Sequence, residues 1–323
     1  MAILVTGATG FLGRHLIARL VKTKDKVRAL TRGASPVPSQ WHGRVEIVAG
    51  DLLDKDCVRS ALQGVTTVFN LAGVVTDPVR MREVNVEGAR VIAEAAGEVG
   101  VSRFIHVSSA GVVGTSGTDV VTEDTLCRPQ DPYEQSKYEG ERAVLESSGV
   151  SGLDSQVLRP TIVFGEGPRS GHDSLLEWMR VIQQGQFVFF GAGGIANYVY
   201  VQDVVEALCQ AAAGPTRGPA VYFVADPAPL KEFVNAMAEA LQVQAPERQL
   251  PVWAGYTSAA LMETGRRLFA LPAPLTKARV RALTTMRVYL GVQFRRMYPD
   301  FCPIGYREGL RRTVAFYRQE GLL

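Results

Sequence analysis

Residues 2–20 read Ala-Ile-Leu-Val-Thr-Gly-Ala-Thr-Gly-Phe-Leu-Gly-Arg-His-Leu-Ile-Ala-Arg-Leu. The first four are an apolar run that predicts a buried β-strand, and apolar side chains at helical spacing follow from Arg14. Between them Gly7, Gly10 and Gly13 form a turn in which the backbone can approach a pyrophosphate at a helix N-terminus. A turn that binds no ligand rarely needs three glycines at this spacing. The stretch therefore predicts a strand, a dinucleotide-binding turn and a helix, with spacing Gly-x-x-Gly-x-x-Gly rather than Gly-x-Gly-x-x-Gly.

The same alternation of strand and helix continues to about residue 160. Strand-like apolar runs occur at 27–30, 45–48, 68–71, 104–107 and 157–158. Helical patterns fill the gaps, most clearly at 81–99 and 133–146. This order is typical of an α/β, Rossmann-like, doubly wound parallel sheet.

After Pro160 the alternation weakens. Glycine-rich loops are expected at 165–171 and 191–194, a strand at 221–224, a helix at 231–241, and mostly helix at 253–290 with breaks at Pro272 and Pro274. We therefore expect a cofactor-binding Rossmann domain over 1–160, to which segments at about 195–225 return. A smaller, mostly helical region over 161–323 would bind the substrate.

Composition narrows the class of protein. Hydrophobic content of 46% and charged content of 21% are ordinary for a globular protein. No apolar run approaches the ~20 residues of a membrane span, so no integral membrane segment is expected. A strand starting at residue 2 leaves no room for a signal peptide, and the four cysteines lack metal-like spacing. We expect a reduced, cytoplasmic protein without a metal.

Charge is distributed unevenly along the chain. Residues 251–323 hold 12 Lys and Arg against 4 Asp and Glu, whereas the whole chain has a net charge of only +3. Such a basic segment suits a phosphorylated substrate, an anionic membrane surface or an acidic partner, or is simply a solvated helical face. Nucleic acid is not expected as a partner, because no aromatic interleaving accompanies the charge.

The pair Tyr133 and Lys137 points to proton-transfer chemistry. A phenol ordinarily titrates near ~10, too high for proton exchange at neutral pH. A lysine four residues on lies on the same helical face, where its charge would lower the tyrosine pKa. A tyrosine adjusted in this way is a general acid/base. Because Tyr-x-x-x-Lys also arises by chance in helices, the pair depends on its context.

That context comes from eight motifs in chain order, through which nearly the whole chain resembles the extended short-chain dehydrogenase/reductase family. The motifs are the turn at 7–13, Gly50-Asp51-Leu52, Asn70-Leu71-Ala72-Gly73, Val84-Asn85-Val86-Glu87-Gly88, His106-Val107-Ser108-Ser109, Tyr133-x-x-x-Lys137, Leu158-Arg159-Pro160 and Val199-Tyr200-Val201-Gln202-Asp203-Val204. Each motif falls on the strand or helix where the family carries it, so chance is a poor explanation for the series.

The resemblance implies a role for each catalytic residue. Tyr133 would be the acid/base, and Lys137 would bind the nicotinamide ribose and lower the tyrosine pKa. Ser109, rather than Ser108, would hold the substrate carbonyl where charge develops. Asn85 matches an asparagine that orders a water relay in shorter family members.

The resemblance also implies the cofactor contacts, with Asp51 on the adenine amino group. The full set is Gly7, Thr9, Gly10, Phe11, Leu12, Gly13, Arg32, Asp51, Leu52, Leu71, Ala72, Gly73, Tyr133, Lys137, Pro160 and Val163.

One position bears on the choice of cofactor. An NAD site usually has Asp or Glu after the second strand, to accept a hydrogen bond from the ribose 2′-hydroxyl. Here the strand ends Ala29-Leu30-Thr31-Arg32-Gly33, with an arginine that suits a 2′-phosphate. We therefore expect NADP, with NAD open because a solvent-facing Arg32 would tolerate either.

A second difference from the family pattern bears on the type of reaction. Dehydratase members carry an acidic pair after the catalytic serine or threonine, but this chain has Ala110-Gly111. Reduction of a ketone, or oxidation of a secondary alcohol, is the leading interpretation. A nucleotide-sugar epimerase with bound NAD(P) and a catalytically idle NADP-binding sensor or scaffold are the alternatives.

Substrate class depends on the second half. Nucleotide-sugar members usually carry an arginine where this chain has Ala196, so it looks nearer to the 3β-hydroxysteroid dehydrogenase and dihydroflavonol reductase branches. Residues 187–190 and 253–271 offer apolar surface for a bulky substrate, or are ordinary core. Arg159 and Arg169 keep a phosphorylated substrate open. A homodimer through the helix at 133–146 is left open, because Ala143 and Val144 there adjoin charged residues.

Overall fold

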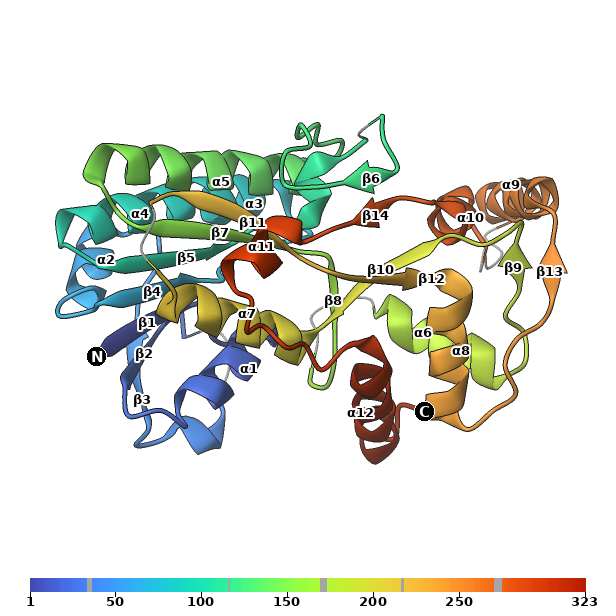
Figure 1. Ribbon diagram of the computed structural model, residues 1–323, viewed down its shortest axis with the longest axis horizontal. Helices are drawn as coiled ribbons and strands as arrows, with labels where there is room; N and C mark the ends of the chain where they lie inside the picture. Colours follow the sequence, from blue (N-terminus) through green and yellow to red (C-terminus); the bar gives the residue numbers. More distant parts are fainter. Residues whose placement is uncertain (34–36, 116, 169–172, 216–217, 270–274) are drawn as a thin grey trace.

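The computed structural model describes residues 1–33, 37–115, 117–168, 173–215, 218–269 and 275–323. A seven-stranded, wholly parallel sheet forms one half of the molecule (Figure 1). In spatial order its strands are β11 (Ala220–Val224), β7 (Ser155–Pro160), β5 (Arg103–Val107), β4 (Thr67–Asn70), β1 (Ala2–Thr6), β2 (Lys26–Thr31) and β3 (Val45–Ala49). From β1 the chain first adds β2 and β3 on one side, and then β4 and the later strands on the other. Ligands of such folds bind at this switch point between β1 and β4. The predicted doubly wound parallel sheet is confirmed.

Helices cover both faces of this sheet (Figure 1). Those on one face are α1 (Phe11–Leu20) and α7 (Val201–Ala213), and those on the other are α2 (Lys55–Ala61), α4 (Ala89–Glu98) and α5 (Pro132–Ser151). Leu16 and Leu208 belong to the first apolar layer, and Ile92 and Val144 to the second. A strand that is buried on both faces is mostly apolar along its length. This is why such strands occur in the sequence as nearly continuous apolar runs.

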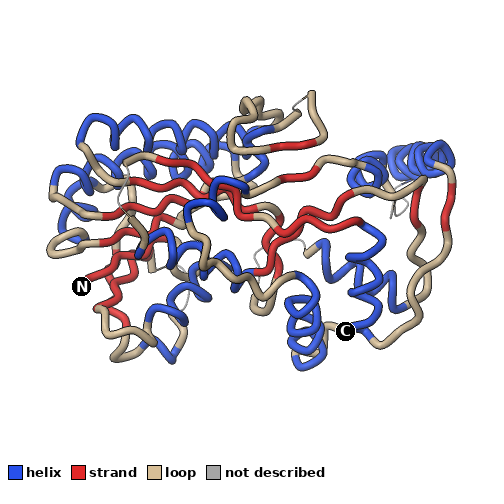
Figure 2. Tube along the Cα trace, viewed as in Figure 1, coloured by secondary structure: helices blue, strands red, loops and turns tan. Residues whose placement is uncertain are grey.

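The other half is smaller and mostly helical (Figure 2). Its sheet comprises β8 (Ile162–Phe164), β10 (Ile195–Tyr200) and β12 (Asp226–Pro229). Its helices are α6 (Ser174–Gln183), α8 (Leu230–Leu241), α9 (Val252–Phe269), α10 (Lys277–Thr284) and α12 (Tyr306–Gln319). Short pairs join β9 (Phe189–Phe190) to β13 (Gln249–Leu250) and β6 (Val120–Val121) to β14 (Val288–Tyr289). Two short helices remain, α3 (Pro78–Met81) and α11 (Val292–Met297).

An aromatic core fills this second half. Phe187, Phe189 and Phe190 lie in it with no more than 5% of their surface exposed. Interpreting 187–190 as a pocket wall is therefore wrong, and the alternative of ordinary core packing holds. These side chains stabilise the region that carries the substrate side of the site without facing that site.

Two aspartates, the buried Asp203 and the half-buried Asp226, fix the start of α12. Asp203 accepts hydrogen bonds from the backbone N–H groups of Ile304 (2.6 Å) and Gly305 (3.0 Å), and Asp226 accepts one from Tyr306 (2.8 Å). Burial raises the pKa of both carboxyls. The carboxylate of the motif at 199–204 thus has a structural use, because it satisfies helix-start N–H groups that would otherwise lack an acceptor.

No helix among the described residues is both long enough and apolar enough to span a bilayer.

Candidate active site

The glycine turn is shaped by close backbone approach. Gly7 has a φ of 63°, and a Cβ there would lie 2.6 Å from the carbonyl carbon of Leu71. A Cβ at Gly13 would lie 2.2 Å from the Gly7 oxygen. Gly10 caps α1 without a side-chain acceptor, and the first turn of α1 holds no acidic residue. The N-terminal N–H groups of α1 are thus available to an anionic group.

A buried polar chain crosses the sheet beside this turn. Thr6 donates from Oγ1 to Oδ1 of Asn70 (2.6 Å), and Asn70 Nδ2 lies 3.1 Å from Nδ1 of His106. Burial and the nearby charge of Lys137 hold the pKa of His106 well below its ordinary value. A neutral imidazole can accept the amide hydrogen of Asn70. The ends of β1, β4 and β5 are thereby tied together.

The three predicted catalytic residues come together where β5 ends and α5 begins. Ser109 caps the short turn that follows β5 by accepting from the N–H of Gly111 (3.1 Å). Its hydroxyl is also hydrogen-bonded to the phenol of Tyr133, in the first turn of α5. Lys137, one turn further along, donates from Nζ to the carbonyl oxygen of Val107 (2.6 Å). Ser109 and Tyr133 thus meet where β5 leads to α5, and the buried Lys137 follows one helical turn after Tyr133.

The electrostatics differ from the expectation for this pair. Burial is the largest influence on the pKa of Tyr133 and raises it. The Ser109 hydrogen bond lowers this pKa in part, and the charge of Asp131 raises it further. Burial lowers the pKa of Lys137 to about 8, opposed by Glu141. The expectation that Lys137 lowers the tyrosine pKa is wrong for this structure, because burial of the phenol dominates and the lysine bonds to a backbone carbonyl. The phenol is consequently protonated at neutral pH.

Asn85 interrupts the helix that the sequence predicts at 81–99. Residues Arg82–Gly88 form a π-helical turn between α3 and α4. Such turns are rare and frequently lie at functional sites. A Cβ at Gly140 would lie 1.9 Å from the Asn85 backbone oxygen, so this glycine lets α5 pack against the turn.

The side chain of Asn85 links the loop after β4 to α5. It accepts from the N–H of Val74 (2.8 Å) and donates to the Val74 oxygen (2.9 Å) and to Oγ of Ser136 (2.9 Å). Ser136 donates in turn to the backbone oxygen of Tyr133 (2.8 Å). The amide is thus engaged in holding Tyr133 in position, with its oxygen on a backbone N–H.

The remaining predicted cofactor residues lie along the carboxyl edge of the main sheet or next to it. Arg32 is exposed just beyond β2, and Asp51 follows β3, where Oδ1 accepts from the N–H of Leu53 (3.0 Å). Leu52 is buried beside Asp51. The others are Thr9, Phe11 and Leu12 at the start of α1, Leu71, Ala72 and Gly73 after β4, Pro160 at the end of β7, and Val163 in β8.

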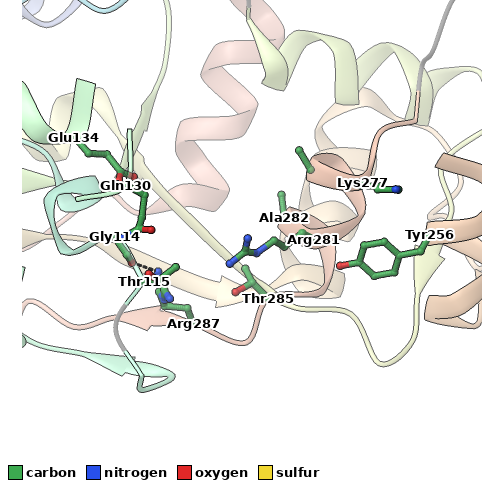
Figure 3. Close-up of a pocket in the computed structure, with 11 residues that line it drawn as sticks. Gly114, Thr115, Gln130, Glu134, Tyr256, Lys277, Arg281, Ala282, Thr285 and Arg287 are labelled. Atoms are coloured by element: carbon green, nitrogen blue, oxygen red, sulfur yellow. Dashed lines mark hydrogen bonds between the residues drawn. The ribbon is translucent and has the colours of Figure 1, made fainter. Parts of the chain in front are cut away.

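A cleft of about 900 Å³ opens between the two halves (Figure 3). Glu134, the residue after Tyr133, lies on its wall, but Ser109, Tyr133 and Lys137 are not among the residues that line it. Its lining comprises Gly114, Thr115, Gln130, Glu134, Tyr256, Lys277, Ala278, Arg281, Ala282, Thr285 and Arg287. Figure 3 shows Gln130 and Glu134 on one side and Arg281 and Tyr256 on the other. Arg287 donates to the Gly114 oxygen across the gap. Most of these residues went unnoticed in the sequence because they lie more than a hundred positions apart.

Of the two arginines considered for a phosphorylated substrate, the structure describes only Arg159, which does not line this cleft. Arg159 is buried and paired with Glu141, so its interpretation as a substrate contact is wrong. Arg169 lies outside the described residues. Among the described residues, no cluster of three His, Cys, Asp or Glu side chains could hold a metal ion.

Comparisons with known proteins agree with this geometry. The model of the NAD dependent epimerase/dehydratase family matches residues 3–225. A 3beta-hydroxysteroid-dehydrogenase/decarboxylase of Arabidopsis thaliana is 29% identical, over 96% of this chain and 78% of that protein. A 3 beta-hydroxysteroid dehydrogenase/Delta 5→4-isomerase of Mycobacterium tuberculosis is 30% identical, over 90% and 82%.

A solved structure is similar over almost the full length. The UDP-glucose 4-epimerase of Thermus thermophilus, in complex with NAD, has a TM-score of 0.71 and 26% identity, over 98% of this chain and 99% of that one. The resemblance inferred from the eight motifs is confirmed. The chain belongs to the NAD dependent epimerase/dehydratase family and is an NAD(P)-dependent oxidoreductase of the extended short-chain dehydrogenase/reductase type.

Proposed function

We propose that this protein is an NADP-dependent ketoreductase or alcohol dehydrogenase for a bulky, largely apolar carbonyl or secondary alcohol. The observation that carries the proposal is the hydrogen bond between Ser109 and Tyr133 beside the buried Lys137. This set is what reduction of a carbonyl requires: a donor to the carbonyl oxygen, a proton source and a fixed positive charge.

The proposed chemistry divides the work among three side chains. When bound, the nicotinamide supplies a hydride to the carbonyl carbon, or removes one in the reverse direction. Ser109 holds the substrate oxygen, and Tyr133 gives its phenolic proton to that oxygen, so that one C–H and one O–H bond form. The raised pKa of Tyr133 keeps this proton in place at neutral pH. Lys137 would bind the nicotinamide ribose and supply a positive charge one helical turn from Tyr133.

We assign the cofactor to residues 1–160 and the substrate to residues 161–323. The turn at 7–13 would hold the pyrophosphate at the N-terminus of α1, and Asp51 would bind the adenine. Arg32 is exposed beyond β2, where a 2′-phosphate would meet it. The Thermus relative binds NAD, so the choice is tested directly: kcat/KM should be higher with NADPH than with NADH, and the reverse would refute the NADP assignment.

The substrate class is supported by the cleft and by the relatives. A volume of about 900 Å³ is within the range for small-molecule sites and accommodates several fused rings. Ala196, at the place of the nucleotide-sugar arginine, is only 3% exposed and offers no charge to a diphosphate. Both curated relatives are named for 3β-hydroxysteroids. NADPH consumption across a panel of cyclic ketones and nucleotide sugars tests this, and turnover confined to the sugars would refute it.

An epimerase is the second candidate. The Thermus relative is one, and Lys277, Arg281 and Arg287 place positive charge around the cleft. Sugar isomerisation without net loss of NADPH would favour this function over reduction. No turnover of any substrate by the wild type would instead favour an idle sensor or scaffold.

Two further expectations stay predictions. One is a cytoplasmic location. The other is a homodimer through α5, for which the apolar residues Ala143 and Val144 offer little, since both are buried inside the chain.

A further inference from the structure

A buried ion pair joins α5, the helix that carries Tyr133 and Lys137, to β7. Arg159 in β7 donates from Nε to Oε2 of Glu141 in α5 (2.9 Å) and from Nη2 to Oε1. The side chains are 5% and 2% exposed. The guanidinium also donates to Sγ of Cys127 (3.2 Å) and lies 5.6 Å from the ring centre of Phe223. These contacts fix the guanidinium of Arg159, and its two hydrogen bonds in turn fix the carboxylate of Glu141.

Glu141 lies one helical turn beyond Lys137 on the same face of α5. Tyr133, Lys137 and Glu141 follow one another at intervals of four residues. Lys137 is 5% exposed, and its ammonium group donates a hydrogen bond to the neutral Val107 oxygen. The ionisable groups around it are Tyr133 and Glu141 on α5, His106 on β5 and, beyond Glu141, Arg159 on β7. Burial keeps His106 neutral, so the only negative charge in this set is that of Glu141.

Stability alone gives little reason to keep such a pair. Buried ion pairs lose much hydration, and replacing both partners with apolar residues of similar volume is often neutral or stabilising. A carboxylate locked in place by an arginine serves better as a fixed charge than as a source of stability.

We propose that Glu141, held by Arg159, is a positioning residue that keeps Lys137 charged in the buried floor of the active site. Its carboxylate offsets the loss of hydration of the ammonium group, so that the positive charge beside Tyr133 persists over the working pH range. The inference rests on the proposed function for the role of that charge, but not for the charge itself.

The chain contains a matched control at the other end of β7. Arg103, the first residue of β5, pairs with Asp154, just before β7, at 2.8 Å and with 7% and 4% exposure. This pair is equally buried but lies at the opposite, amino-terminal edge of the sheet. If the Glu141–Arg159 pair only stabilised the fold, neutralising either pair would have the same effect on the titration of Lys137.

The test measures the titration of Lys137 by NMR in protein labelled with ¹³C at lysine Cε, with the signal assigned from Lys137→Met. Glu141→Gln should lower the midpoint from about 8 by about one pH unit or more. Glu141→Gln leaves the Arg159 charge unpaired, so the neutral pair Glu141→Gln with Arg159→Met is measured as well. Its midpoint should also fall below that of the wild type, but by less, because the Arg159 charge that lowers the lysine pKa is absent. Asp154→Asn with Arg103→Met should leave the midpoint unchanged.

A midpoint in the neutral-pair variant equal to that of the wild type would overturn the proposal, as would an equal shift in the control pair. The alkaline limb of kcat/KM for NADPH-dependent reduction supplies a second readout, which should move down with the lysine midpoint. Failure of the wild type to reduce any ketone would count against the proposed function only, since the NMR titration needs no substrate.

Discussion

Arg287 donates a hydrogen bond to the carbonyl oxygen of Gly114 and so joins the segment after α10 to the loop that leaves Ser109. The two residues are 173 positions apart, and both line the cleft. Asn197 holds the backbone of Arg287 in place, because its Nδ2 donates to the Arg287 carbonyl oxygen (2.8 Å). This charged hydrogen bond, together with the pairing of β6 and β14, ties the second half of the chain to the loop after Ser109.

Arg287→Met should therefore weaken substrate use more than it weakens the fold. A hydrogen bond from a charged group contributes about 1.5–3 kcal/mol, so kcat/KM should fall by about tenfold or more, mostly through KM. Arg279→Met is the matched control, because Arg279 on α10 pairs with Glu177 at the surface and outside the cleft. Steady-state kinetics of the two variants settle the point, and equal losses would contradict it.

Tyr133→Phe removes the proposed proton donor while keeping the ring. Proton transfer by a positioned side chain contributes roughly 10²–10⁴-fold, so kcat should fall by that order. Cofactor affinity, followed by NADPH fluorescence, should change little. A variant that retains full activity would exclude Tyr133 as the acid/base.

Arg32→Ala should alter the choice of cofactor. Hydrogen bonds to a charged group contribute about 1.5–3 kcal/mol, so kcat/KM with NADPH should drop by about ten- to a hundredfold. NADH has no 2′-phosphate, and its kcat/KM serves as the internal control that stays constant. Equal effects on both cofactors would show that Arg32 does not read the 2′-phosphate.

Lys137→Met should remove activity yet stabilise the protein at neutral pH. Burial lowers the pKa of Lys137 from 10.5 to about 8, so the unfolded chain binds this proton more tightly and stability rises between pH 8 and 10.5. Below pH 8 the cost is complete and corresponds to about 3 kcal/mol. Urea unfolding should show a gain of that order at pH 7 and a smaller one at pH 10. Lys24→Met, at an exposed site, should show neither.

The sequence was sufficient to predict the sheet and the placement of Tyr133 and Lys137 on one helix, because both are encoded locally. Parallel strands buried on both faces are continuous apolar runs, and Tyr133 and Lys137 lie four residues apart on one helix. The pairing of Glu141 with Arg159 was not foreseeable in this way. Glu141, on a largely polar helix, suggests a solvated face, and only the packing of α5 on β7 buries it against Arg159. The π-helical turn at Asn85 depends likewise on the approach of Gly140.

The glycine turn offers a test in which conformation and close approach can be separated. Gly7 and Gly43 both have positive φ, 63° and 73°, but a Cβ at Gly43 would meet nothing within 4 Å. Gly43→Ala should therefore cost only the left-handed strain, about 1–2 kcal/mol. Gly7→Ala adds a contact at 2.6 Å with the Leu71 backbone, and overpacking of this kind costs about 1–3 kcal/mol more. Because the loop after β4 must then shift, Gly7→Ala should also lose NADPH affinity, which Gly43→Ala should keep. Equal unfolding free energies and equal cofactor affinities for the two variants would show that the close approach at Gly7 has no energetic role.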